Sequence, residues 1–105
     1  MVDPVNYVMV EVGKPRVMRF DKYAWDNRTI PDPRLGFSKT VRTLVFHVTE
    51  LDLKPADTTF SVVSTVLQAE FQPYLDNGSY ATRRFTIIKE AGGYSPPKIS
   101  RAEPV

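Results

Sequence analysis

Apolar and polar side chains alternate most regularly in two parts of the chain, residues 41–49 and 80–90. Alternation with a period of two places every second side chain on the same face of a strand. Both segments are therefore predicted to be strands with one buried face. Residues 5–12 and 58–63 are rich in β-branched and aromatic types, which predicts two more strands.

The segment after residue 63 has the spacing of an amphipathic helix instead. Leu67 and Phe71 recur at an interval of four positions. Ser64 is suited to cap the first turn, and Pro73, which has no backbone N–H, is expected to end the helix after residue 72. The Asp-Asn-Gly-Ser run of residues 76–79 predicts a turn, because Asn-Gly accepts positive φ.

The inward faces of these predicted elements define an expected core. Its members are Leu44, Phe46, Val48, Phe60, Val62, Leu67, Phe71, Phe85 and Ile87.

Other stretches lack this periodicity. Gly13 interrupts the apolar pattern that residues 16–20 resume, as a hairpin turn or a bulge would. Residues 21–40 contain two prolines and are predicted to form a long loop, which in a compact domain is usually functional or disordered. The Lys-Pro-Ala-Asp run at 54–57 predicts a turn. Residues 100–105 are expected to be a flexible tail, which leaves residues 1–99 as a single β-rich domain.

The predicted order is strand, long loop, two strands, one short helix, a strand and a possible last strand near Tyr94. This order resembles that of the OB-fold, a small Greek-key barrel that binds oligonucleotides or oligosaccharides. The resemblance covers residues 5–99, rests on element order, and implies a mainly β fold with one short helix in a small five- to six-stranded barrel. Pro96 and Pro97 suit a last strand poorly, so an SH3-like barrel or an antiparallel sheet plus a helix remains open.

Composition limits the classes of function. The 105 residues fit one domain, and 14 Lys and Arg against 12 Asp and Glu leave a weakly basic net charge of +2. The absence of cysteine excludes disulfides, thiolate metal sites and cysteine nucleophiles. The first residues show no signal-peptide pattern, and no apolar run is long enough to span a membrane. We therefore expect a cytoplasmic protein with no membrane partner.

Catalytic and metal-binding motifs are not apparent. The single histidine, His47, lies on the more polar face of a predicted strand and is expected to be partly exposed. Zinc would need about four Cys, His or carboxylate ligands. Asp21, Asp26 and Asp32 could bind a hard cation, but ordinary loop acids are the better interpretation. We expect a protein that is not an enzyme and holds no cofactor or metal.

Basic and aromatic residues are interleaved in and around the predicted loop, an arrangement that suits single-stranded nucleic acid. Rings can stack on bases while cations neutralise phosphates. The candidate nucleic-acid-binding residues are Arg19, Lys22, Tyr23, Trp25, Arg28, Arg34, Phe37, Lys39, Arg42, Arg83 and Arg84. Alternatively, Trp25 and Phe37 fold back to plug the end of a barrel, or the loop contacts a protein.

The sequence thus favours a non-enzymatic binding protein, with sequence-tolerant binding of single-stranded DNA or RNA as the leading hypothesis. The alternative is a protein–protein interaction or assembly module, such as a homodimer, that acts through residues 21–40 or a strand edge.

Overall fold

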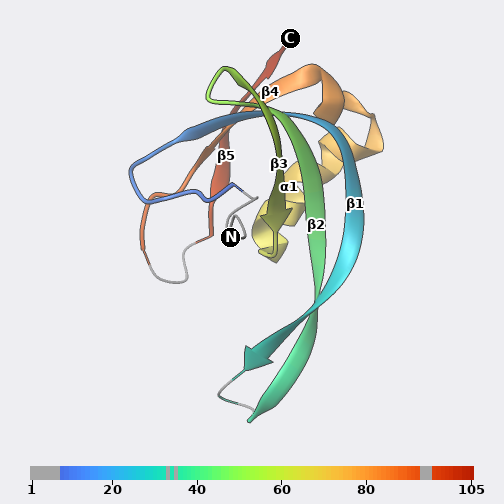
Figure 1. The fold of residues 1–105 in the computed structure, drawn as a ribbon, viewed down its shortest axis with the longest axis vertical. Coiled ribbons are helices and arrows are strands. Elements are labelled where there is room, and N and C mark those ends of the chain that lie inside the picture. The colour runs from blue at the N-terminus through green and yellow to red at the C-terminus, as the bar shows by residue number, and fades with distance from the viewer. Residues whose placement is uncertain (1–7, 33, 35, 93–95) are drawn as a thin grey trace, which may run out of the picture.

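The computed structural model describes residues 8–32, 34, 36–92 and 96–105. Its five strands form one antiparallel sheet in the order β3-β2-β1-β4-β5 (Figure 1). The elements are β1 (Arg16–Asp32), β2 (Phe37–Leu51), β3 (Lys54–Val62), α1 (Thr65–Asp76), a 3-10 turn (Ser79–Thr82), β4 (Arg83–Ile88) and β5 (Lys98–Pro104). The expected mainly β fold with one helix is confirmed. The sheet is not closed into a barrel, and β3 and β5 are its two edges.

The prediction of a loop at residues 21–40 was wrong, because most of this segment lies in β1 and β2. The two strands pair from Met18 opposite Leu51 to Asp32 opposite Phe37. Their distal parts have no other strand beside them and project from the body of the protein (Figure 1). We call residues 22–42 the ribbon. Its free edges tolerate a proline that donates no ladder hydrogen bond, which is why Pro31 does not prevent pairing.

Two β-bulges mark the place where the ribbon leaves the body. Asp21 is an extra residue on β1, and Thr49 is an extra residue on β2. The two insertions fall on opposite strands, so they cancel, and the register beyond them equals the register before them. The bulges therefore bend the strand pair without exchanging its buried and exposed faces.

The core lies between the sheet and α1. All nine residues expected there are buried, and Val8, Met18, Phe20 and Leu75 join them. Phe20 stacks on Phe46 with ring centroids 4.2 Å apart. Phe71 brings the helix into this aromatic cluster, with its ring centroid 4.7 Å from that of Phe46.

The helix begins as expected and ends later than expected. Ser64 is the N-cap, and its hydroxyl accepts a hydrogen bond from the Leu67 N–H. Pro73 does not terminate α1 but lies within it on the exposed side. The last turn of α1 continues because Leu75 is buried in the core. The free energy gained by this burial offsets the loss of the one backbone hydrogen bond that Pro73 cannot donate.

The turn between β2 and β3 and the start of β4 also differ from the sequence prediction. The turn between β2 and β3 falls at Asp52 and Leu53, both with positive φ, and residues 54–57 belong to β3. The predicted strand at 80–90 is a 3-10 turn followed by the shorter β4. Gly78, at φ 76°, supplies the positive φ that the Asn-Gly pair predicted.

Each edge strand of the sheet, β3 and β5, has a hydrogen bond to a group outside the sheet. Residues 8–10 form no strand, contrary to expectation, and the predicted residues 5–7 lie outside the described part. The Val8 N–H donates to the Thr59 carbonyl at 2.7 Å, on the free edge of β3. At the other edge, the Ile99 N–H donates to the Glu70 carboxylate of α1 at 3.0 Å. Each edge therefore has one of its backbone groups already bonded.

The expected flexible tail forms most of β5 instead. This strand pairs with β4 from Lys98 to Pro104, and Ile99 and Ala102 pack against the core. Pro96 and Pro97 precede the first residue of β5, so they do not interrupt its ladder. The expected start of a last strand near Tyr94 falls outside the described residues.

Candidate functional site

The structure separates the candidate residues into two groups. The first group lies on the ribbon and consists of Lys22, Tyr23, Trp25, Arg28, Arg34, Phe37, Lys39 and Arg42. The second group, Arg19, Arg83 and Arg84, lies on the body, where β1 pairs with β4. Phe37 is placed by its backbone, opposite Asp32.

Trp25 and Arg42 form a stacked pair on one face of the ribbon. Trp25 lies opposite Leu44 in the ladder, and its half-buried ring packs against the edge of the core. The Arg42 guanidinium carbon lies 4.0 Å from the centroid of this ring, which is a cation–π contact. Gln68 of α1 donates to the Arg42 carbonyl at 2.8 Å and fixes this part of β2 against the helix. The Trp25 ring therefore both packs against the core and contacts the Arg42 guanidinium.

Tyr23 has a more structural position than Trp25. Its ring meets that of Tyr80 edge to face, with centroids 4.9 Å apart, and tilts against Phe46 at 6.2 Å. These contacts extend the aromatic core toward the base of the ribbon, where Tyr23 supports the strand.

Arg28 lies on the opposite face of the ribbon, two positions along from Asp26. Its side chain crosses β2, and a guanidinium nitrogen donates to the Ser61 hydroxyl on β3 at 3.0 Å. Lys22 and Lys39 lie on this same face, because alternate residues of a strand share a side. The ribbon thus carries cations on both faces.

Two of the three body arginines, Arg83 and Arg84, hydrogen-bond to other groups of the body through their side chains. Arg84 donates to both carboxylate oxygens of Glu50, at 2.8 and 3.3 Å. This bond holds the pKa of Glu50 below its ordinary value and raises the pKa of Arg84. Arg83 donates to the Ala102 carbonyl at 3.1 Å. Arg19 lies opposite Glu50 in the ladder. The structure does not bring these three residues to the ribbon.

Positive charge is concentrated on the ribbon. Residues 22–42 contain five cationic and two acidic side chains, whereas the rest of the chain contains nine cationic and ten acidic ones. The ribbon therefore accounts for the whole excess of positive charge. Several body cations meet carboxylates, as Arg16 meets Asp52 at 2.9 Å and Lys98 meets Glu90 at 2.9 Å.

The partners of Arg28 and Arg42 are uncharged by contrast, a hydroxyl and an indole ring. Neither of these contacts pairs the guanidinium with a carboxylate, so both groups can interact with an anionic ligand.

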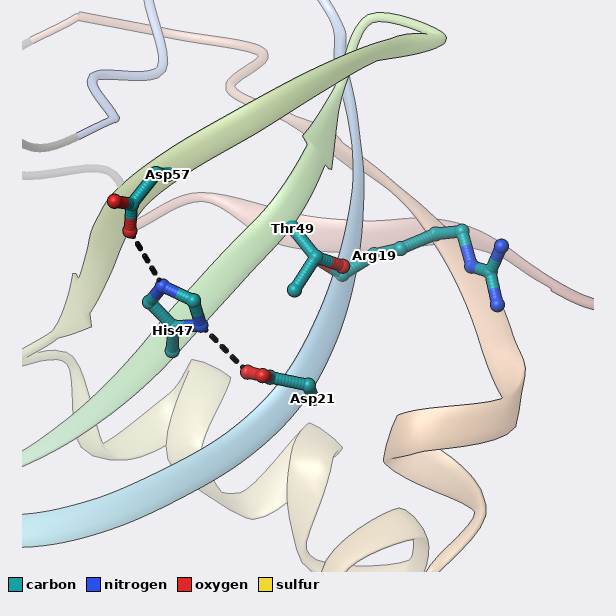
Figure 2. Close-up of polar contacts among 5 residues, drawn as sticks. All are labelled: Arg19, Asp21, His47, Thr49 and Asp57. Carbon is teal, nitrogen blue, oxygen red and sulfur yellow. Dashed lines mark hydrogen bonds and ion pairs between the residues drawn. The ribbon is translucent and has the colours of Figure 1, made fainter.

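His47 sits between two carboxylates on the exposed side of the sheet, an arrangement that the sequence did not reveal (Figure 2). Its Nε2 lies 2.7 Å from Asp57 Oδ1, and its Nδ1 lies 2.6 Å from Asp21 Oδ1. The hydrogen bond to Asp57, followed by that to Asp21, raises the pKa of His47 above its ordinary value. The same contact lowers the pKa of Asp21. The imidazolium form can donate to both carboxylates at once.

The bulges of the sheet create this arrangement. Asp21 is the extra residue on β1, and Asp57 lies where the pairing of β2 and β3 shifts register. Asp21 and Asp57 contact different nitrogens on opposite sides of the His47 ring, so the three side chains do not surround a common point. The described residues contain no group of three or more His, Asp or Glu side chains that could hold a metal ion.

Comparisons with protein-family models, with curated proteins and with solved structures each found no match. Among the described residues, no helix is both long and apolar enough to cross a membrane.

Proposed function

We propose that this protein is a non-enzymatic binder of single-stranded nucleic acid and that the ribbon is its binding element. The observation that carries the proposal is the concentration of charge, since residues 22–42 hold the whole positive excess of the chain. A two-stranded, basic element is accessible to a flexible polyanion along its distal part, which projects from the body and has no other strand paired with it.

The Arg42–Trp25 pair supplies the stacking surface. The guanidinium covers one face of the indole at 4.0 Å, so a base stacks on the plane of Arg42 rather than directly on the ring. Guanidinium planes, like aromatic rings, accept unpaired bases without selecting among them. Sequence-tolerant binding follows from this kind of contact.

The cations on the opposite face supply the phosphate contacts. Lys22, Arg28 and Lys39 share that face, and the ribbon is only two strands wide, with strands about 5 Å apart. A nucleotide chain can therefore pass around the free edge of the ribbon, with bases at Arg42 and phosphates at the other face.

The pairing of the strands supports an OB-like arrangement as the frame for this binding. β1 pairs with β2 and β4, β2 pairs with β3, and β4 pairs with β5, with α1 following β3. We propose that this is a partly open OB-like barrel whose seam lies between β3 and β5. In that fold the β1–β2 connection and the face of strands 2 and 3 contact the ligand.

The alternative of assembly through a strand edge has less support. Val8 bonds to the edge of β3, and Glu70 bonds to the Ile99 N–H on the edge of β5. A backbone group that is already bonded does not pair with a strand of a second chain at that position.

Fluorescence anisotropy with labelled oligothymidylate and oligouridylate at several salt concentrations tests the proposal. Contacts to about four phosphates give a slope of log K against log salt near −3, since each single-strand contact contributes about −0.7. Arg42→Gln should weaken binding, because it removes the plane on which a base stacks. Arg101→Gln is the matched control, because it removes the same charge from an exposed position on β5. Equal effects of the two variants, or no wild-type binding at low salt, would contradict the proposal.

A further inference from the structure

A pocket of about 290 Å³ lies where the ribbon meets β3. The described residues that line it are Val8, Arg28, Thr59 and Ser61. The volume corresponds to about ten water molecules at roughly 30 Å³ each, enough for a phosphate group with part of its hydration shell. The pocket is therefore large enough for an anion of that size.

The lining has the chemistry of an anion site. Arg28 contributes a guanidinium, Ser61 and Thr59 are hydroxyl-bearing residues, and no carboxylate is among the described lining residues. Arg28 is held there in advance, because its nitrogen donates to Ser61 Oγ at 3.0 Å. A guanidinium has five N–H donors, so this one bond leaves donors for an anion's oxygens.

The nearest acidic residue along β3 is held by another group. Asp57 lies two positions from Thr59, and its Oδ1 is bonded to His47 Nε2 at 2.7 Å. This contact directs the carboxylate oxygen to the imidazole. Arg28 thus provides the unneutralised charge at the pocket.

We propose that this pocket is a phosphate subsite, in which Arg28 and Ser61 hold one phosphate of a bound single strand. That the phosphate belongs to a nucleic acid rests on the proposed function. That the pocket binds phosphate rests on its lining residues alone. Ser61 acts both as the group that positions Arg28 and as a hydroxyl contact to the phosphate oxygens.

Two titrations separate the subsite from the wider function. In the first, inorganic phosphate is added to ¹⁵N-labelled protein, and the amide signals of Thr59 and Ser61 and the Arg28 side-chain signal are followed. In the second, labelled oligothymidylate is titrated by anisotropy. The variants are Arg28→Gln and Ser61→Ala, with Arg101→Gln as a control that removes the same charge from an exposed position on β5.

We expect phosphate to shift these signals in the wild type and in Arg101→Gln, and not in Arg28→Gln. Ser61→Ala should reduce the shift of the Arg28 signal while it leaves the net charge unchanged. Oligonucleotide affinity should fall about tenfold in Arg28→Gln, the effect of one charge-assisted hydrogen bond.

Oligonucleotide binding without any phosphate-induced shift at these residues would overturn the subsite and leave the proposed function standing. Phosphate shifts at the pocket without oligonucleotide binding would support the pocket as a phosphate site and overturn the proposed function.

Discussion

His47 Nδ1 and Asp21 Oδ1 lie 2.6 Å apart, and this contact joins β2 to the bulge of β1 from which the ribbon departs. A carboxylate oxygen can only accept at this distance, so the imidazole nitrogen must carry a proton. With Asp57 accepting on the other ring nitrogen, the arrangement selects the charged imidazolium.

The first prediction is that stability depends on pH through His47. Its pKa is raised in the folded state, so its contribution is fully present below the unfolded value of about 6.5 and is lost as pH rises through the raised folded value. The melting temperature should therefore fall as pH rises above about 6.5. His47→Gln should flatten this dependence, and parallel pH profiles for the two proteins would show that the contact does not stabilise the fold.

The second prediction concerns the aromatic core. Phe46 is fully buried and stacks on Phe20. Phe46→Ala should lower the free energy of unfolding by about 3–5 kcal/mol in urea titration, because it removes buried area and leaves a cavity. Lys22→Ala, at an exposed position of the next strand, is the control and should change it by less than about 0.5 kcal/mol. A loss below about 1 kcal/mol for Phe46→Ala would be inconsistent with this packing.

The third prediction concerns the end of the chain. Deleting residues 100–105 removes most of β5, including Ala102, which packs on the core. The melting temperature should fall by more than about 5 °C, since about 1 kcal/mol corresponds to 4–8 °C in a domain of this size. Arg101→Ala, which alters only an exposed side chain of the strand, should leave it nearly unchanged. An unchanged melting temperature after the deletion would mean that β5 adds nothing to stability.

The fourth prediction uses the proline within α1. Pro73 is exposed and cannot donate to the helix, so Pro73→Ala should restore a hydrogen bond and raise the free energy of unfolding by about 1–3 kcal/mol. Urea titration measures the change. A decrease would indicate that the proline ring stabilises the turn before Asn77 more than the missing bond destabilises it.

The core was predictable from the sequence because burial follows periodicity. Phe46 and Phe85 belong to alternating segments, and Leu67 and Phe71 to a helical one, so their inward direction could be inferred locally. Met18 and Phe20 were not placed in the core, because the glycine, prolines and charges around them obscured the continuity of β1.

The ribbon could not be predicted for a different reason. Its two strands stabilise each other through a ladder whose register is a property of the pair, and Pro31 lowers the strand propensity of one of them. The interleaved aromatic and basic residues of this segment were visible in the sequence. The contact between Trp25 and Arg42 depends on the fold, since the two are 17 positions apart in sequence.

The His47 arrangement had no local signal at all. It needs the bulge on β1 and the register shift on β3 to bring Asp21 and Asp57 to the two ring nitrogens. Bulges depend on how strands fit together and not on the composition of one strand, so a single histidine on a polar face gave no indication of its partners.

The bulge at Asp21 also acts as the pivot of a lever. From that point, residues 22–32 extend for about 35 Å at roughly 3.3 Å per residue. A change in direction of about 10° at the pivot moves the tip by about 6 Å over that length. A neutral His47 can donate from only one ring nitrogen, so loss of its proton leaves either Asp21, at the base of the ribbon, or Asp57 without a hydrogen bond from the imidazole.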